Sequence, residues 1–194
     1  MGYRNLTSFS FYNLSIVVIC YLLSFLIVSS VITPIQGHFI ANSNLVSLMF
    51  LPHGVRVLTC VIYGARMGAL YLFLASILSV FLTGTSGAYD SLAEVLQLFV
   101  GALCVPVAFV FLQFIHEDAK IGLTSISHNT IKTITSLALI SSIINSVGQT
   151  LILDGFSGFE VQPRIILKFL LGDLLGALML FICLRFALNR INFI

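Results

Sequence analysis

Three ionisable side chains lie deep inside apolar runs of the sequence, where such groups are rare. His53 and Arg56 share one run and are three residues apart, so they lie on one face of a helix. Asp173 lies in another run and is the only acidic residue deep within an apolar segment. An ionisable group at membrane depth costs about 2.5–3.5 kcal/mol and normally has a partner. We therefore expect a buried ion pair between Arg56 and Asp173.

The depths of these two residues agree with such a pair. If the helix that carries Arg56 begins near Leu45 at the outer surface, Arg56 lies roughly 16 Å deep and Asp173 roughly 12 Å deep. The pair could be an architectural strut that fixes the register of two helices, or it could bind a ligand or relay a proton. The sequence leaves both interpretations open.

A candidate polar pocket is predicted in the outer half of the bundle, where polar side chains of several segments converge. Asn145 and Gln149 are four residues apart on one segment, and His53, Gln97 and Lys168 complete the set. The pocket could hold a small molecule, and interhelical hydrogen bonds of about 0.6 kcal/mol each are the alternative. Because His53 has no second His or Cys at ligand spacing, we expect no metal and no cofactor.

Two pairs of glycines are expected to serve helix packing. Gly64 and Gly68 are four residues apart, as are Gly172 and Gly176, and this spacing permits close approach of two backbones. The first pair spans a turn. The second pair would press its helix against a neighbour around Asp173.

No catalytic motif is present in the sequence. It lacks a nucleophile elbow, an H-E-x-x-H pair and a phosphate-binding P-loop. The 4 cysteines lie in apolar runs without metal-ligand spacing. We predict no catalytic residues and a protein that is not an enzyme.

The composition identifies the class of protein. Of the 194 residues, 59% are hydrophobic and only 8% are charged, whereas about a quarter are charged in soluble domains. With a mean hydropathy of +1.11, the chain is expected to be an all-α, polytopic membrane helix bundle that forms a single domain over residues 1–194. Membrane lipids are its expected surroundings, and nothing indicates nucleic acid as a partner.

About six segments are long enough to cross the membrane. They are residues 13–33, 45–64, 67–84, 94–115, 132–152 and 165–186. Only Ala65 and Arg66 join the second to the third, which predicts a tight antiparallel hairpin. Pro52 is expected to loosen the second helix in its interior.

The distribution of Lys and Arg predicts that both termini are cytoplasmic. The outer side then has Arg164 and Lys168 as its only basic residues, and the outer connections are residues 34–44, 85–93 and 153–164. The basic residues assigned to the cytoplasmic side are Arg4, Arg66, Lys120, Lys132, Arg185 and Arg190.

Short motifs resemble the MASE-one type of bacterial membrane-associated sensor domain. In that family, a Pro-x-Gly helix runs into a short glycine-bearing turn, and the last helix carries Gly-Asp followed by a second glycine. Family members commonly have about eight segments and a cytoplasmic kinase or cyclase domain, whereas this chain has six and stops at Ile194. The resemblance implies a stand-alone sensor or docking module in the bacterial inner membrane, with a separate protein as its cytoplasmic partner. The matching stretches, within residues 50–186, are Leu51-Pro52-His53-Gly54, Tyr63-Gly64-Ala65-Arg66 and Leu171-Gly172-Asp173-Leu174-Leu175-Gly176.

A second resemblance is to the substrate-binding components of energy-coupling-factor vitamin transporters. It is carried by size, six helices, cytoplasmic termini and the glycine-bearing stretches 63–70 and 171–175. This resemblance implies a vitamin site formed by outer loops and the polar residues of the outer half. A third class, which no motif distinguishes, is a structural accessory subunit of a larger membrane complex.

Overall fold

The computed structural model describes residues 9–39, 47–83, 91–115, 128–157 and 163–191, and all regular structure in this part is helical. Five helices are long and apolar enough to span a membrane, counting α1 to α2 as one continuous helix. The elements are α1 (Phe11–Ile27), the π-helical turn η1 (Val28–Ile32), α2 (Thr33–Phe39), α3 (Leu51–Thr83), α4 (Ser91–Ile115), α5 (His128–Ser157) and α6 (Pro163–Ile191).

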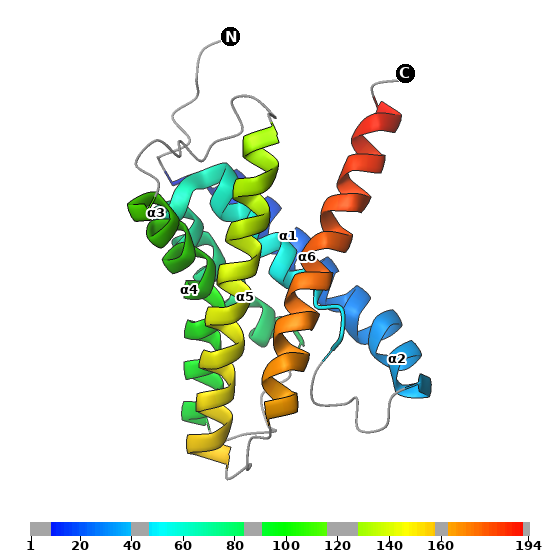
Figure 1. The fold of residues 1–194 in the computed structure, drawn as a ribbon, viewed down its shortest axis with the longest axis vertical. Coiled ribbons are helices and arrows are strands. Elements are labelled where there is room, and N and C mark those ends of the chain that lie inside the picture. The colour runs from blue at the N-terminus through cyan, green and yellow to red at the C-terminus, as the bar shows by residue number, and fades with distance from the viewer. Residues whose placement is uncertain (1–8, 40–46, 84–90, 116–127, 158–162, 192–194) are drawn as a thin grey trace.

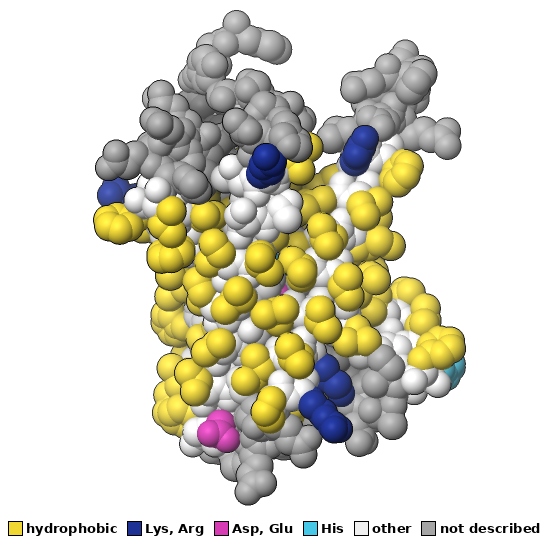
Figure 2. Space-filling view, in the orientation of Figure 1, with side chains coloured by type: hydrophobic (Ala, Val, Ile, Leu, Met, Phe, Trp, Pro, Cys, Tyr) yellow, Lys and Arg dark blue, Asp and Glu magenta, His cyan; other side chains and the backbone are white. Residues whose placement is uncertain are grey.

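The surface of the helix bundle is that of a membrane protein. Figure 2 shows apolar side chains over the middle of one face, with Lys and Arg side chains towards its two ends. Large apolar side chains such as Phe81 and Phe114 are 83% and 85% exposed. Water would make this exposure unfavourable, whereas lipid satisfies it. The five long helices and this surface together define a multi-pass membrane protein.

Helix α3 reverses its direction at Gly64, where φ is 78° and ψ is 170°. This conformation is nearly restricted to glycine. In a straight helix, residues 60 and 68 would lie about 12 Å apart, yet a Cβ built on Gly68 would lie 3.0 Å from the Cα of Cys60. The rings of Tyr63 and Tyr71 are likewise 5.0 Å apart. The two parts, residues 51–63 and 65–83, therefore lie side by side, and the count of six crossings stays a prediction.

The first part of α3 begins at Leu51, not near residue 45 as expected. Residues 47–50 are not helical, and they pack against α6: the Phe50 N–H donates to the Gly172 carbonyl at 2.8 Å. A Cβ at Gly172 would collide with the Ser47 carbonyl, and one at Gly176 would collide with the Phe50 carbonyl. Non-helical backbone is tolerated at membrane depth where protein covers it.

This start of α3 corrects the expected role of Pro52. The residue lies in the first turn of a helix, not in its interior. A missing N–H costs no hydrogen bond there, because the first four N–H groups of a helix have no intrahelical partner. Pro52 therefore helps to start the helix instead of loosening it.

Other boundaries also differ from the predicted segments. The first helix continues through Pro34 to Phe39, so residues 34–39 are not a loop, and a π-helical turn precedes the proline. Helices α5 and α6 extend beyond the predicted apolar cores into more polar sequence. Hydrogen bonds within a helix continue past the end of an apolar run, so hydropathy alone underestimates helix length.

Helix α3 is the centre of the bundle and packs against α1, α4, α5 and α6 (Figure 1). Its Gly64 turn lies at the same end as the start of α1, because the Ser10 N–H donates to the Tyr71 hydroxyl at 3.0 Å. The end of α6 lies at this end as well (Figure 1). The opposite end of residues 51–63 lies in the bundle interior, against α6.

Candidate buried polar site

Polar side chains from four helices meet inside the bundle, beside the start of α3. His53 is fully buried, and Arg56 and Asp173 are 6% and 2% exposed. We call this group the buried polar cluster, and its members are Tyr21 of α1, His53, Arg56 and Ser76 of α3, Ser141, Ser142 and Asn145 of α5, and Asp173 of α6.

Arg56 binds a phenol and two aromatic rings. Its Nε and Nη2 atoms donate to the Tyr21 hydroxyl at 3.1 and 2.7 Å. The guanidinium carbon lies 5.6 Å from the Tyr21 ring centroid and 5.4 Å from that of Phe50, so both rings contribute cation–π attraction. The Nη1 atom is buried without a hydrogen-bond partner. The charge is therefore stabilised by aromatic groups.

The predicted Arg56–Asp173 ion pair is not formed. Within the described part of the chain, the basic group within 4 Å of Asp173 is His53, whose Nδ1 lies 3.6 Å from Oδ2. Asp173 Oδ2 also accepts from Asn145 Nδ2 at 2.7 Å. The prediction is wrong because His53, one turn before Arg56, is the residue of α3 that faces Asp173, whereas Arg56 binds Tyr21 of α1.

His53 joins α3 to α5 and α6. Its Nε2 atom lies 3.0 Å from Ser141 Oγ and 3.3 Å from Ser142 Oγ. Its Nδ1 atom faces Asp173 and has no hydrogen-bond partner. Among the described residues, no three His, Cys, Asp or Glu side chains form a group that could hold a metal ion.

The residues of the predicted pocket form a hydrogen-bonded chain from α4 to α6. Gln149 Nε2 donates to the backbone carbonyl of Gln97 at 3.0 Å and lies 3.4 Å from Asn145 Oδ1. Asn145 in turn donates to Asp173. Gln97 thus takes part through its backbone. Lys168 is half-buried on α6, and no hydrogen bond or ion pair joins it to the other described side chains.

Sequence reasoning missed half of the cluster, namely Tyr21, Ser76, Ser141 and Ser142. A signal for the two serines was present, because Ser141, Asn145 and Gln149 recur every four residues, as do Ser142, Ser146 and Thr150, and the two sets form a polar stripe on α5. Tyr21 and Ser76 carry no such signal, because single polar residues in apolar helices are usually packing residues.

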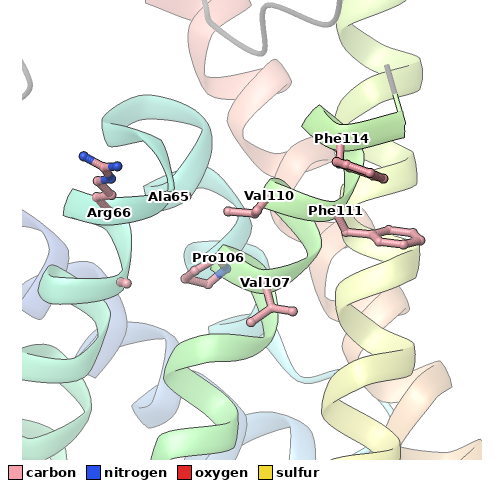
Figure 3. Close-up of a pocket in the computed structure, with 8 residues that line it drawn as sticks. Ala65, Arg66, Pro106, Val107, Val110, Phe111 and Phe114 are labelled. Carbon is pink, nitrogen blue, oxygen red and sulfur yellow. The ribbon is translucent and has the colours of Figure 1, made fainter. Parts of the chain in front are cut away.

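A surface groove lies at the other end of residues 51–63. It has a volume of about 590 Å³ and is formed by the turn of α3 and the second half of α4 (Figure 3). Arg66 is its single charged lining residue, and Phe111 and Phe114 form the opposite side. We call it the Arg66 groove, and its lining residues are Ala65, Arg66, Ala69, Pro106, Val107, Val110, Phe111 and Phe114.

Two of the three stretches that carry the first family resemblance, residues 51–54 and 171–176, lie close together. A Cβ at Gly54 would lie 3.0 Å from the Cα of Ala177, next to the Gly172–Gly176 contact with residues 47–50. No family model, curated protein or solved structure matches the chain. The class of protein is therefore defined here by fold and site: a multi-pass helical bundle around a buried polar cluster.

Proposed function

We propose that this chain is a membrane sensor or docking module that signals to a separate protein at the cytoplasmic face. One observation carries the proposal: residues 51–63 connect the buried polar cluster to the Arg66 groove. This short helix is about 20 Å long. His53 and Arg56 lie near its first residue, in the bundle interior, and Gly64 to Arg66 follow its last residue, at the groove. A movement of this helix at the buried polar cluster would therefore change the wall of the Arg66 groove.

The proposed topology has six crossings and cytoplasmic termini in a bacterial inner membrane. The reversal of α3 at Gly64 supports this count, because residues 65–83 would supply one crossing and residues 51–63, together with residues 47–50, would supply another. The positive-inside rule supports the orientation. The Gly64 turn, the start of α5 and the end of α6 lie at one end of the bundle and are near Arg66, Lys132 and Arg185, whereas the start of α6, near Arg164 and Lys168, lies at the other end (Figure 1). Arg4 and Lys120 lie outside the described residues.

The buried polar cluster supplies an element that can have two states. His53 Nδ1 and Arg56 Nη1 are both buried without hydrogen-bond partners. Each buried polar atom without a partner costs about 1–3 kcal/mol. A second arrangement that gives either atom a partner therefore gains that amount, provided that the other contacts stay the same. A stimulus that supplies a partner can thus shift residues 51–63.

The proposed occupant of the Arg66 groove is a membrane helix of a partner protein with an acidic residue near its cytoplasmic end. The groove lining is almost wholly apolar, which suits a helix in lipid. The Arg66 guanidinium points away from Pro106 and Phe111 (Figure 3), so it would pair with an acidic residue at the edge of the groove. A phospholipid in the groove is the competing outcome.

Photocross-linking from the groove tests this function. A photoreactive benzophenone amino acid replaces Phe114 in the groove or, as a matched control, Phe81, which is equally exposed but does not line it. We expect a cross-linked protein band in native membranes with the probe at residue 114, absent at 81 and lost with Arg66→Glu. Lipid adducts alone at both positions would contradict docking.

The second candidate is a substrate-binding component of a vitamin transporter. It is favoured by the start of α3 inside the bundle, because broken helices form substrate and ion sites in transporters. The hydrogen-bonded chain from Gln97 to Asp173 would line that site. Mass spectrometry of the natively purified protein separates the candidates: a retained small molecule that Asn145→Ala releases would favour transport.

A further inference from the structure

The hydrogen bonds around His53 favour one position for its ring proton. Ser141 Oγ donates to the Ala138 carbonyl at 3.1 Å, and Ser142 Oγ donates to the same carbonyl at 2.7 Å. Each hydroxyl has only one proton to donate. Assigning both hydroxyl protons to the Ala138 carbonyl leaves His53 Nε2, which lies 3.0 and 3.3 Å from these two oxygens, as the donor in both contacts.

A neutral imidazole with its proton on Nε2 has a bare acceptor at Nδ1. This atom is buried, lacks a hydrogen-bond partner and faces Asp173 Oδ2 at 3.6 Å. A carboxylate oxygen is also an acceptor. Two acceptors thus face each other across a distance that is too long for a hydrogen bond. One added proton on either atom would turn the contact into a donor–acceptor pair.

We propose that the gap between His53 Nδ1 and Asp173 Oδ2 is a proton-binding site. The proton comes from water, binds a lone pair on one of the two atoms, and breaks no other bond in the protein. The resulting hydrogen bond draws the start of α3 towards α6. The inference rests on the proposed function in one respect: the proton is the stimulus that the sensor module detects.

The surroundings of the site contain one permanent charge. Arg56 lies one turn from His53 on α3, and its positive charge opposes the uptake of a second positive charge. Asn145 already donates to Asp173 Oδ2, so that oxygen has a lone pair left for the proton. The site is therefore empty at high pH and filled at low pH. The other described titratable groups that face the cluster are Tyr21 of α1, Cys60 of α3 and Cys104 of α4, and α5 contributes only the neutral Ser141, Ser142 and Asn145.

Nitrogen NMR of a chain with a single histidine tests the site. His38, His116 and His128 are replaced by Gln, and the ¹⁵N-histidine-labelled protein is titrated with acid in lipid bilayers. At high pH we expect a proton on Nε2 and a bare Nδ1. On acidification, the Nδ1 resonance should shift as that atom gains a proton or accepts a hydrogen bond. Asp173→Asn should abolish the shift, because the variant lacks the carboxylate with which His53 would share the proton.

Two results would overturn the inference. Either can be seen in the single-histidine protein that retains Asp173, so the test does not depend on the folding of Asp173→Asn. One is a proton on Nδ1 throughout the titration, which would make His53 a fixed donor to Asp173. The other is an Nδ1 resonance that does not change with pH. Cross-linking at residue 114 is measured separately: a pH-dependent resonance without a cross-linked protein would leave the proton site intact and refute docking.

Discussion

The backbone is not helical at two places around α3, residues 47–50 before its start and Gly64 at its turn. Both places depend on glycine, for different reasons. At its start, residues 47–50 lie directly on Gly172 and Gly176 of α6, where any side chain would collide with backbone. At its turn, Gly64 has open space around it, and only its φ of 78° requires glycine. The start is thus held by tertiary packing and the turn by local conformation. Substitutions should separate these two kinds of constraint.

The largest effect is expected for Gly176→Ala. The new methyl group would meet the N, C and O atoms of Phe50, and backbone atoms cannot rotate away as a flexible side chain can. We expect a loss of about 3 kcal/mol or more, at the upper end of overpacking effects, measured by denaturant unfolding in detergent. Gly155→Ala is the matched control, because Gly155 has nothing within 4 Å. Equal stability of the two variants would contradict the packing at the start of α3.

Tyr21→Phe should have the next largest effect, since the Tyr21 hydroxyl ties the two parts of α3 together at a distance from the turn. It accepts from Arg56 of the first part and from Ser76 of the second part at 3.4 Å. Removing it leaves donors of a buried guanidinium unsatisfied, which should cost about 2 kcal/mol. Thermal unfolding measures the change. A variant as stable as the wild type would show that Arg56 does not depend on Tyr21.

Gly64→Ala should cost about 1–3 kcal/mol, the range for residues held in this sparsely populated conformation. No clash contributes, so the effect comes from the backbone alone. Gly155→Ala is again the control and should leave stability unchanged or raise it by up to about 1 kcal/mol. If both alanine variants unfold at the same denaturant concentration, α3 does not reverse at Gly64.

Ser76→Ala should have the smallest effect. Its contact with Tyr21 is 3.4 Å long, and interhelical hydrogen bonds in membranes average about 0.6 kcal/mol. We expect unfolding within about 0.5 kcal/mol of the wild type. A loss as large as that of Tyr21→Phe would assign the tie between the two parts of α3 to Ser76 instead.

The helical class and most helix positions could be predicted from the sequence, because apolar runs of spanning length have few other uses. The start of α3 could not. Residues 48–50 are all apolar, and only the contact of residues 47–50 with the glycines of α6 shows why they are not helical.

The polar residues that meet in the cluster were predictable in part. Depth placed Arg56 near Asp173, and the predicted polar pocket placed His53 with Asn145, since similar distances from one surface place residues at one level. Which of them touch depends on the rotation of each helix about its axis, and hydropathy does not determine that rotation. Tyr21 could not be predicted as the partner of Arg56, because it resembles any other buried aromatic residue.

The central claim is that residues 51–63 couple the buried polar cluster to the Arg66 groove. Cross-linking from residue 114 tests it most directly, compared in native membranes between the wild type, Asp173→Asn and Ser76→Ala at matched expression. Our account predicts that Asp173→Asn changes the yield of the protein cross-link and that Ser76→Ala does not. Equal yields from all three proteins, each folded and with a clear cross-link, would show that the groove does not respond to the cluster and would contradict the account.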